Sequence, residues 1–334
     1  MNTMHLGVSP GASDIRTPSP IAADVHRGLS AKAKSLPAYL LYDEEGSRLY
    51  ELITELPEYY PTRTERGILE RHAADIVERA AIGSSSDLRV VELGAGTATK
   101  TRLLLSAVVE RQGHCVYMPI DVSSSALDEA KSNLAKELPA VDVRPFVGRH
   151  EDAFDSIGKL GARRLVLFIG SSIGNFSDDE AHHLLSGVRS GLSVGGVLLL
   201  GTDLRKNPAR LVPAYDDAQG VTAAFNKNVL ARINRELGGA FSLDHFRHIA
   251  LWNDAASQME MFLESTRDQD VAIDGLDLVV HFRKGERIHT ESSAKYVLPR
   301  VSSMLAKAGF ALEKTYTDDE GLFAVNLARA CATA

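Results

Sequence analysis

The fold is decided by residues 88–105, which read LRVVELGAGTATKTRLLL. Residues 88–93 are apolar and branched, which predicts a buried strand, and a helical pattern begins near Thr97. Gly94 and Gly96 lie in the turn between them, where glycine lets backbone N–H groups approach a ligand closely. The stretch therefore predicts a ligand-binding strand–turn–helix unit of an α/β fold.

An acidic residue follows the next expected strand. Residues 115–120 form that strand and Asp121 ends it, where a carboxylate can accept both hydroxyls of a ribose. A dinucleotide fingerprint needs a third glycine where Thr99 stands, so a dehydrogenase is disfavoured. Strand, Glu92, glycine turn, helix, strand and Asp121 together resemble the S-adenosylmethionine (SAM) site of Rossmann-type methyltransferases. A glycine turn that serves only to reverse the chain is the alternative interpretation.

Strands and helices alternate over residues 88–204. The expected strands are residues 88–93, 115–120, 141–147, 164–170 and 196–202, with helices that start near Thr97, Ser125, Asp152 and Asp178. This order predicts a doubly wound parallel sheet, whose ligands bind beyond the carboxyl ends of the strands. Glu92, Asp121, Gly148 and Asn175 fall at or just beyond such ends, so they mark one expected site.

The chain is long enough for this Rossmann-type sheet and a second, smaller substrate domain. Residues 205–295 interrupt the alternation with a long helix and strand-like stretches, and the chain then returns to a helix and a last strand. The expected divisions are a flexible tail (1–24), N-terminal helices that contribute to the substrate domain (25–85), a SAM-binding sheet domain (86–204 and 296–334) and a substrate-domain insertion (205–295).

Composition excludes several classes of function. The chain has 334 residues, is 44% hydrophobic and carries a formal net charge of −7, which argues against a nucleic-acid surface. No apolar run reaches membrane-span length and no signal peptide is visible, so no membrane association is expected. Cys115 and Cys331 are the only cysteines, and metal-binding spacings are absent. This predicts a reducing cytoplasm, no disulfide and no metal site.

The break ELPEYYPTRTE lies between two expected N-terminal helices. Tyr59 can wall a small polar ligand, whereas Tyr60 is expected to be exposed. Thr62 with Glu65 predicts a capping box that starts the second helix. That helix is expected to bury His72 as a satisfied core histidine.

Further polar residues are candidates for binding a small substrate. Asn175 can accept a hydrogen bond from an amine and donate one to a carboxylate, unless it only satisfies its own turn. Tyr215 is a better candidate than its neighbours Asp216 and Asp217, which are expected in a solvated turn. In IHTESSAKY, Glu291 and Ser293 share a strand face and can hold one heteroaromatic N–H and one ring nitrogen, although an exposed polar strand edge is the default interpretation.

Several motifs across residues 40–325 strongly resemble the histidine-specific N-methyltransferases of ergothioneine biosynthesis. The motifs are LPEYYPTRTE, ELGAGTATKT, PIDVS, FIGSSIGNF, AYDDAQGVTAAFNKNVLARINREL and TESSAKY. The long block that starts AYDD is specific to that family, whereas ELGAGT is common to many methyltransferases. The resemblance implies SAM-dependent trimethylation of the histidine α-amine to hercynine, without a metal, by an enzyme expected to be a monomer.

The resemblance also implies residue roles, by motif position. It places the substrate against Tyr59, Asn175, Tyr215, Met261, Glu291, Ser292 and Ser293, with Tyr59 and Asn175 as the catalytic pair. It places SAM against Tyr42, Gly94, Gly96, Lys100, Asp121, Arg149 and His150. The family usually has an Asp-Phe pair that frames the adenine of SAM, and this chain has Arg149 and His150 there. In an alternative alignment, Glu151 and Asp152 take the place of that pair. An N-methyltransferase of another amino acid and a non-catalytic SAM-binding regulatory module are the alternative functions.

Overall fold

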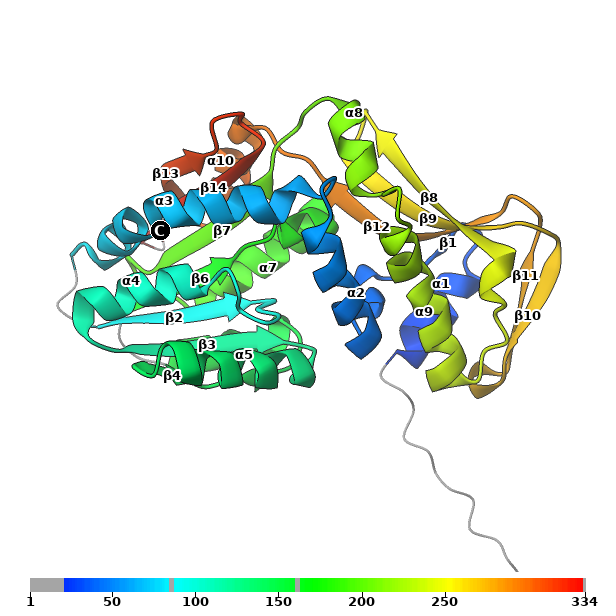
Figure 1. Ribbon diagram of the computed structural model, residues 1–334, viewed down its shortest axis with the longest axis horizontal. Coiled ribbons are helices and arrows are strands. Elements are labelled where there is room, and N and C mark those ends of the chain that lie inside the picture. Colours follow the sequence, from blue (N-terminus) through cyan, green and yellow to red (C-terminus); the bar gives the residue numbers. More distant parts are fainter. Residues whose placement is uncertain (1–20, 84–86, 160–162, 333–334) are drawn as a thin grey trace, which may run out of the picture.

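The computed structural model describes residues 21–83, 87–159 and 163–332, and two sheets organise them (Figure 1). The larger sheet has eight strands, in the order β13-β14-β7-β6-β2-β3-β4, with β5 beside β3. Its strands are β2 (Leu88–Leu93), β3 (Cys115–Asp121), β4 (Val141–Val143), β5 (Phe146–Val147), β6 (Arg163–Phe168), β7 (Val197–Asp203), β13 (Phe310–Thr317) and β14 (Phe323–Ala330). The predicted α/β fold class is confirmed.

The direction of the strands explains where a ligand can bind. The strands from β7 through β6, β2 and β3 to β4 are parallel, and β14 and β13 close the edge in antiparallel fashion. The chain runs outward from β2 through β3 to β4, and later outward on the other side through β6 to β7. The order therefore reverses between β2 and β6, and such a switch point opens a crevice at the carboxyl ends of the strands.

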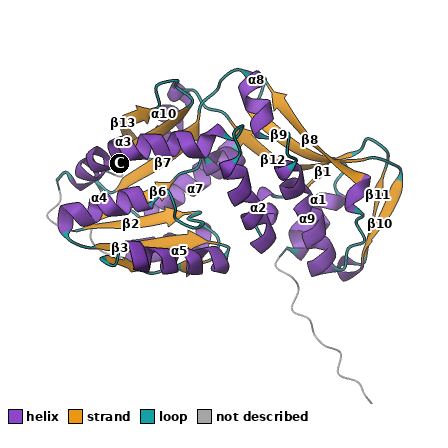
Figure 2. Cartoon of the chain, in the orientation of Figure 1, coloured by secondary structure: helices purple, strands orange, loops and turns teal. Residues whose placement is uncertain are grey.

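Helices cover both faces of this sheet, as the layers in Figure 2 show. One core lies between the sheet and the apolar sides of α3, α4 and α5, and another between the sheet and α6, α7 and α10. The helices are α1 (Ala22–Ser30), α2 (Glu44–Glu55), α3 (Tyr60–Ala81), α4 (Arg102–Gln112), α5 (Ser124–Glu137), α6 (Phe154–Lys159), α7 (Asp178–Ser190), α8 (Pro208–Leu211), α9 (Val221–Leu237) and α10 (Leu298–Lys307). None of the described helices is long and apolar enough to cross a membrane.

The second sheet has the order β1-β12-β9-β8 and lies beside α9 and a two-stranded hairpin (Figure 1). Its strands are β1 (Lys34–Ser35), β8 (Phe246–Asn253), β9 (Gln258–Ser265) and β12 (Arg287–Ala294), and the hairpin is β10 (Gln269–Ile273) with β11 (Leu278–Phe282). The alternation in β9 buries Met259, Met261 and Leu263. These residues join the N-terminal segment in a separate core.

The N-terminal helices do not all belong to that core. Tyr60, at the start of α3, packs in the core of the second sheet, whereas Ile68, Leu69 and Ile76 pack in the core of the larger sheet. We therefore propose that the boundary between the two units lies within α3 rather than at residue 85. Of the expected tail, residues 1–20 lie outside the described residues, and α1 already begins at Ala22.

The structure corrects the expected start of α3. The helix begins at Tyr60, and Glu65 caps nothing, because its buried carboxylate binds Lys100 and the backbone N–H of Gly170. Tyr60 is fully buried, not exposed, and donates a hydrogen bond to Asp203. His72 is half-buried and packs against the ring of Tyr316.

The structure also moves some other boundaries. The helix after the glycine turn begins at Arg102 rather than near Thr97, because the backbone is left-handed at Gly94, Gly96 and Ala98. The expected strand 141–147 is divided into β4 and β5, and β13 precedes the last strand. Asp217 is buried rather than solvated, since its carboxylate accepts the N–H groups of Val221 and Thr222 at the start of α9.

Short 3-10 helices lie in several of the connections. They are η1 (Ala38–Leu41), η2 (Glu151–Ala153), η3 (Ser172–Asn175), η4 (Val212–Ala214), η5 (Leu243–His245) and η6 (Asp274–Leu276).

Candidate active site

The glycine turn after β2 is held open against the end of β3. Gly94 has a φ of +67° and Gly96 a φ of +52°, values that favour glycine. Asp121 Oδ2 accepts the N–H of Gly96 at 2.9 Å, and Oδ1 accepts the N–H of Ser123 at 2.9 Å. The turn and the carboxylate are therefore fixed side by side, with Asp121 only half-buried and still open to a ligand.

Glu92, the acidic residue of the motif, lies beneath this turn. It is 2% exposed and accepts hydrogen bonds from Thr101 Oγ1 at 2.7 Å and from the hydroxyl of Tyr117. Burial raises its pKa to about 7, even though these hydrogen bonds favour the charged form. Glu92 thus anchors the start of the helical segment after the turn.

A long cleft runs from the glycine turn towards the second sheet. All seven residues that the sequence predicts for the cofactor line it: Tyr42, Gly94, Gly96, Lys100, Asp121, Arg149 and His150. A turn of backbone N–H groups, a carboxylate at the end of the next strand and an aromatic-rich wall fit a nucleoside with a charged tail. Among the described residues no group of three or more His, Cys, Asp or Glu side chains could hold a metal ion.

Arg149 and His150 have different surroundings within the cleft. The exposed guanidinium of Arg149 lies 5.2 Å from the centroid of the Tyr39 ring. The His150 ring lies 5.5 Å from Phe168 and 6.3 Å from Phe176, measured between centroids. Burial lowers the pKa of His150, so its imidazole is held neutral among these rings.

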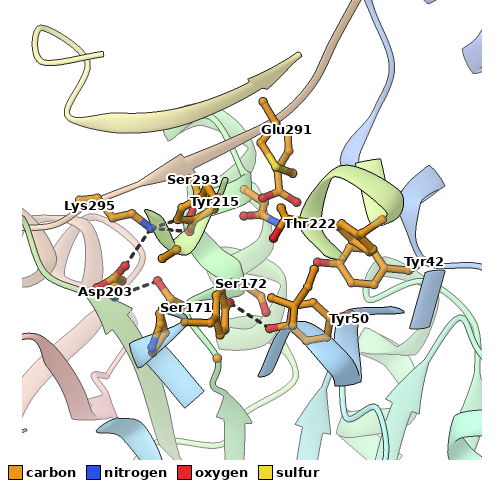
Figure 3. A pocket seen from close by; sticks show the side chains of 18 residues that line it. Tyr42, Tyr50, Ser171, Ser172, Asp203, Tyr215, Thr222, Glu291, Ser293 and Lys295 are labelled. Atoms are coloured by element: carbon orange, nitrogen blue, oxygen red, sulfur yellow. Dashed lines mark hydrogen bonds and ion pairs between the residues drawn. The ribbon is translucent and has the colours of Figure 1, made fainter. Parts of the chain in front are cut away.

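A smaller pocket adjoins the cleft where the two sheets meet (Figure 3). Six of the predicted substrate residues line it: Tyr59, Asn175, Tyr215, Met261, Glu291 and Ser293. Tyr42, Asn175 and Glu291 line both spaces, so the pocket and the cleft lie next to each other. A ligand in the pocket and one in the cleft would therefore meet near these three residues.

Ser292 does not join the pocket. Its Oγ contacts His289 Nε2 at 2.9 Å and accepts a longer hydrogen bond from Gln258 Nε2, on the opposite face of β12. Successive side chains of a strand point to opposite faces, so Glu291 and Ser293 face the pocket while Ser292 cannot. Of the seven residues predicted to bind the substrate, Ser292 is thus the one that lines the larger cleft and not the smaller pocket.

Glu291 is the one acidic side chain of the pocket that has no described partner. It is 7% exposed, and no hydrogen bond joins its carboxylate to another residue in the described part of the chain. Burial raises its pKa to about 7, and the nearby positive charge of Lys295 lowers it only partly. A buried carboxylate without a hydrogen bond is costly, so its position points to a ligand that supplies one.

Asn175 and Tyr59 also line the pocket. Asn175 ends η3, and its side chain bonds to no other residue in the described ranges, so it does not serve its own turn there. The Tyr59 hydroxyl lies 3.3 Å from that of Tyr50, and burial raises the Tyr59 pKa well above its ordinary value. Tyr59 is therefore a neutral phenol that can accept or donate a hydrogen bond.

Tyr215 and Ser293 belong to a buried polar cluster with Lys295 and Asp203 (Figure 3). Lys295 Nζ contacts Tyr215 Oη at 2.7 Å, Ser293 Oγ at 2.9 Å and Asp203 Oδ2 at 2.8 Å. Neither Lys295 nor Asp203 was selected from the sequence. Period-two alternation from Ser293 places Lys295 on the same strand face, and Asp203 follows a predicted strand as Asp121 does. The sequence therefore contains a pattern that indicates each of these two residues.

The chain is similar to known proteins over most of its length. A family model described as histidine-specific methyltransferase, SAM-dependent, matches residues 21–330. The chain is 45% identical over 305 residues to the histidine N-alpha-methyltransferase of Mycolicibacterium smegmatis, covering 91% of this chain and 93% of that protein. It is 41% identical over 324 residues to the Mycobacterium tuberculosis protein of the same name, covering 97% of each. Ergothioneine biosynthesis protein 1 of Neurospora crassa is 30% identical over 297 residues, 86% of this chain and 33% of that protein.

Proposed function

The chain belongs to the family of SAM-dependent, histidine-specific methyltransferases, and on that premise we propose that it methylates the α-amino group of L-histidine. Three successive transfers from SAM give hercynine, a step of ergothioneine biosynthesis. Two mycobacterial relatives of nearly equal length carry the histidine N-alpha-methyltransferase name, which supports this acceptor.

The observation that carries the proposal is Glu291. Its buried carboxylate faces the pocket without a described partner, and Ser293 lies on the same face of the same strand. An imidazole side chain offers one N–H and one bare nitrogen, which a carboxylate and a hydroxyl can bind together. We propose that Glu291 and Ser293 bind the imidazole, with Met261 packed against it.

Asn175, Tyr59 and Tyr215 are proposed to bind the amine and carboxylate of the substrate. Support comes from Asn175, which borders both the pocket and the cleft and has a free amide that can accept from an amine and donate to a carboxylate. Tyr59 and Tyr215 add neutral hydroxyls, since burial raises the pKa of both. A small number of neutral hydrogen-bonding groups suits a substrate amine that must rotate between three successive methyl transfers.

The cleft is proposed to hold SAM, with its ribose on Asp121 and its adenine towards His150. When bound, SAM supplies a methyl group on a sulfonium, which an amine takes by direct displacement. The chain contributes mainly alignment of the amine lone pair with the S–CH3 bond, and such positioning supplies several kcal/mol. Arg149, His150 and Glu151 all line the cleft. Asp152 does not line it, and its carboxylate instead accepts the backbone N–H of Arg149.

The quaternary state and compartment are part of the proposal. Cys115 is buried and Cys331 exposed, and neither forms a disulfide, which suits a reducing cytoplasm. We propose a monomer that acts on a small molecule, and the small size of the pocket supports the small-molecule substrate.

The test is methyl transfer from labelled SAM to each amino acid in turn. Histidine is expected to take up label faster than every other amino acid. Transfer to several unrelated amino acids at similar rates would support the alternative acceptor, and SAM binding without any transfer would support a regulatory module.

A further inference from the structure

Lys295 is the buried cation beside the proposed imidazole site. Its side chain is 1% exposed, and its Nζ lies 2.8 Å from Asp203 Oδ2. It also donates to Tyr215 Oη at 2.7 Å and to Ser293 Oγ at 2.9 Å. An ammonium has three N–H donors and no acceptor, so these contacts use all of them. Lys295 can therefore act on a ligand only through its neighbours.

Ser293 has both lone pairs occupied by the protein. Its Oγ accepts one hydrogen bond from Lys295 and another from Tyr215 Oη, each at 2.9 Å. A hydroxyl has two acceptor sites and one O–H donor, and no described residue accepts the donor of Ser293. Because Ser293 faces the pocket, its O–H can donate a hydrogen bond to a ligand, whereas its oxygen cannot accept one from a ligand.

Because both lone pairs of Ser293 are occupied, only one of two ways of binding a heteroaromatic ring is possible. A glutamate can accept a ring N–H while the serine donates to a bare nitrogen, or a protonated glutamic acid can donate while the serine accepts. The second arrangement requires a free lone pair on Ser293. Lys295 and Tyr215 occupy both lone pairs, so only the first arrangement remains.

We propose that Lys295 is a positioning residue that fixes the direction of the hydrogen bonds around the substrate ring. The inference rests on the proposed binding of the ring by Glu291 and Ser293. It specifies a neutral five-membered ring with an N–H towards Glu291 and a bare nitrogen towards Ser293. Discrimination against rings that lack this bare nitrogen then depends on Lys295, which acts through its hydrogen bond to Ser293.

Lys206 provides a matched control for the test. It pairs with the same carboxylate, Asp203, and is also largely buried, but it contacts neither Tyr215 nor Ser293. Lys206→Met and Lys295→Met therefore each remove one cation beside Asp203, while only Lys295→Met frees a lone pair of Ser293. A general loss of packing or charge balance should affect both variants.

The readout is the ratio of kcat/KM for histidine to that for the two pyrrolylalanines, which keep a ring N–H and replace the other nitrogen with C–H. Wild type and Lys206→Met are expected to share one ratio. In Lys295→Met the ratio is expected to fall about fivefold, the value of one ordinary hydrogen bond, towards that of Ser293→Ala. A structural defect alone lowers both rates in equal proportion and leaves the ratio unchanged.

An unchanged ratio in folded Lys295→Met, beside a lowered ratio in Ser293→Ala, would overturn the inference. If Lys295→Met does not fold, combining it with Asp203→Asn and Lys206→Met removes all three charges of the buried cluster together, and the ratio of the two kcat/KM values in that triple variant decides instead. If wild type fails to methylate histidine, the proposed function itself fails, and this is seen before any variant is compared.

Discussion

Glu65 and Gly170, separated by 105 residues of chain, are joined by hydrogen bonds from the Gly170 N–H to both carboxylate oxygens, at 2.9 and 3.0 Å. The same carboxylate pairs with Lys100, which lies in the turn after β2. One fully buried side chain of α3 thus ties together the turns that follow β2 and β6. Both turns border the proposed SAM cleft, so Glu65 fixes the spacing of its walls.

Glu65→Gln is expected to destabilise the protein by about 3 kcal/mol, because it leaves the largely buried Lys100 ammonium without its counter-charge. The glutamine oxygen can still accept the Gly170 N–H, so the loss reports the ion pair. Urea unfolding measures it, with Glu70→Gln on the exposed side of the same helix as the control. Equal stability of the two variants would show that the pair contributes nothing.

Asp121→Ala is expected to weaken SAM binding by about one to two decades, since hydrogen bonds to a charged group contribute roughly 1.5–3 kcal/mol. The variant also leaves the N–H groups of Gly96 and Ser123 without their acceptor, which loosens the glycine turn. Calorimetric titration with SAM provides the measurement. Asp128→Ala, on the exposed side of α5, is the control and should bind as wild type does. If Asp121→Ala bound SAM with unchanged affinity, the cofactor would have to bind elsewhere.

Glu291→Ala and Asn175→Ala are expected to separate ring recognition from the handling of the amine. Glu291→Ala should raise the histidine KM and weaken the rejection of tryptophan, because a site loses selectivity when its hydrogen-bonding group is removed. Asn175→Ala should lower turnover of both amino acids alike, since both carry the same amine and carboxylate. Steady-state kinetics with histidine and tryptophan give the comparison. A proportional loss of both activities in Glu291→Ala would contradict the assigned roles.

Glu291→Gln is expected to change the pH dependence of stability. Burial raises the folded-state pKa of Glu291 from 4.5 to about 7, so the folded protein holds this proton more tightly than the unfolded chain. The free energy of unfolding of wild type should therefore fall, relative to the variant, as pH rises from about 4.5 to about 7. Above pH 7 the difference should be constant. Urea unfolding across this range, with Glu70→Gln as control, tests it, and a difference that does not vary with pH would contradict the buried, uncompensated carboxylate.

The sequence could predict the residues whose positions follow from local periodicity. Gly94, Asp121 and Asn175 come just after strands that the apolar pattern marks, and the ends of parallel strands lie at one edge of a sheet. Alternation likewise placed Glu291 and Ser293 on one face, and it excludes Ser292 from that face once it is applied strictly.

Other features depend on contacts between distant parts of the chain. Glu65 has the spacing of a capping box with Thr62, yet its partner is a backbone N–H beyond β6, which no local pattern can indicate. Tyr60 is buried because Asp203, at the end of β7, accepts its hydroxyl. The functional partnership of Lys295 with Tyr215 likewise joins segments separated by 80 residues.

The most direct test of the central claim is a competition experiment with all the protein amino acids at equal concentration, excess SAM and mass spectrometry of the products. We predict that histidine carrying one, two and then three methyl groups dominates, with fragmentation placing every methyl on the α-nitrogen. Comparable methylation of several unrelated amino acids, or methyl groups on the imidazole ring, would contradict the account.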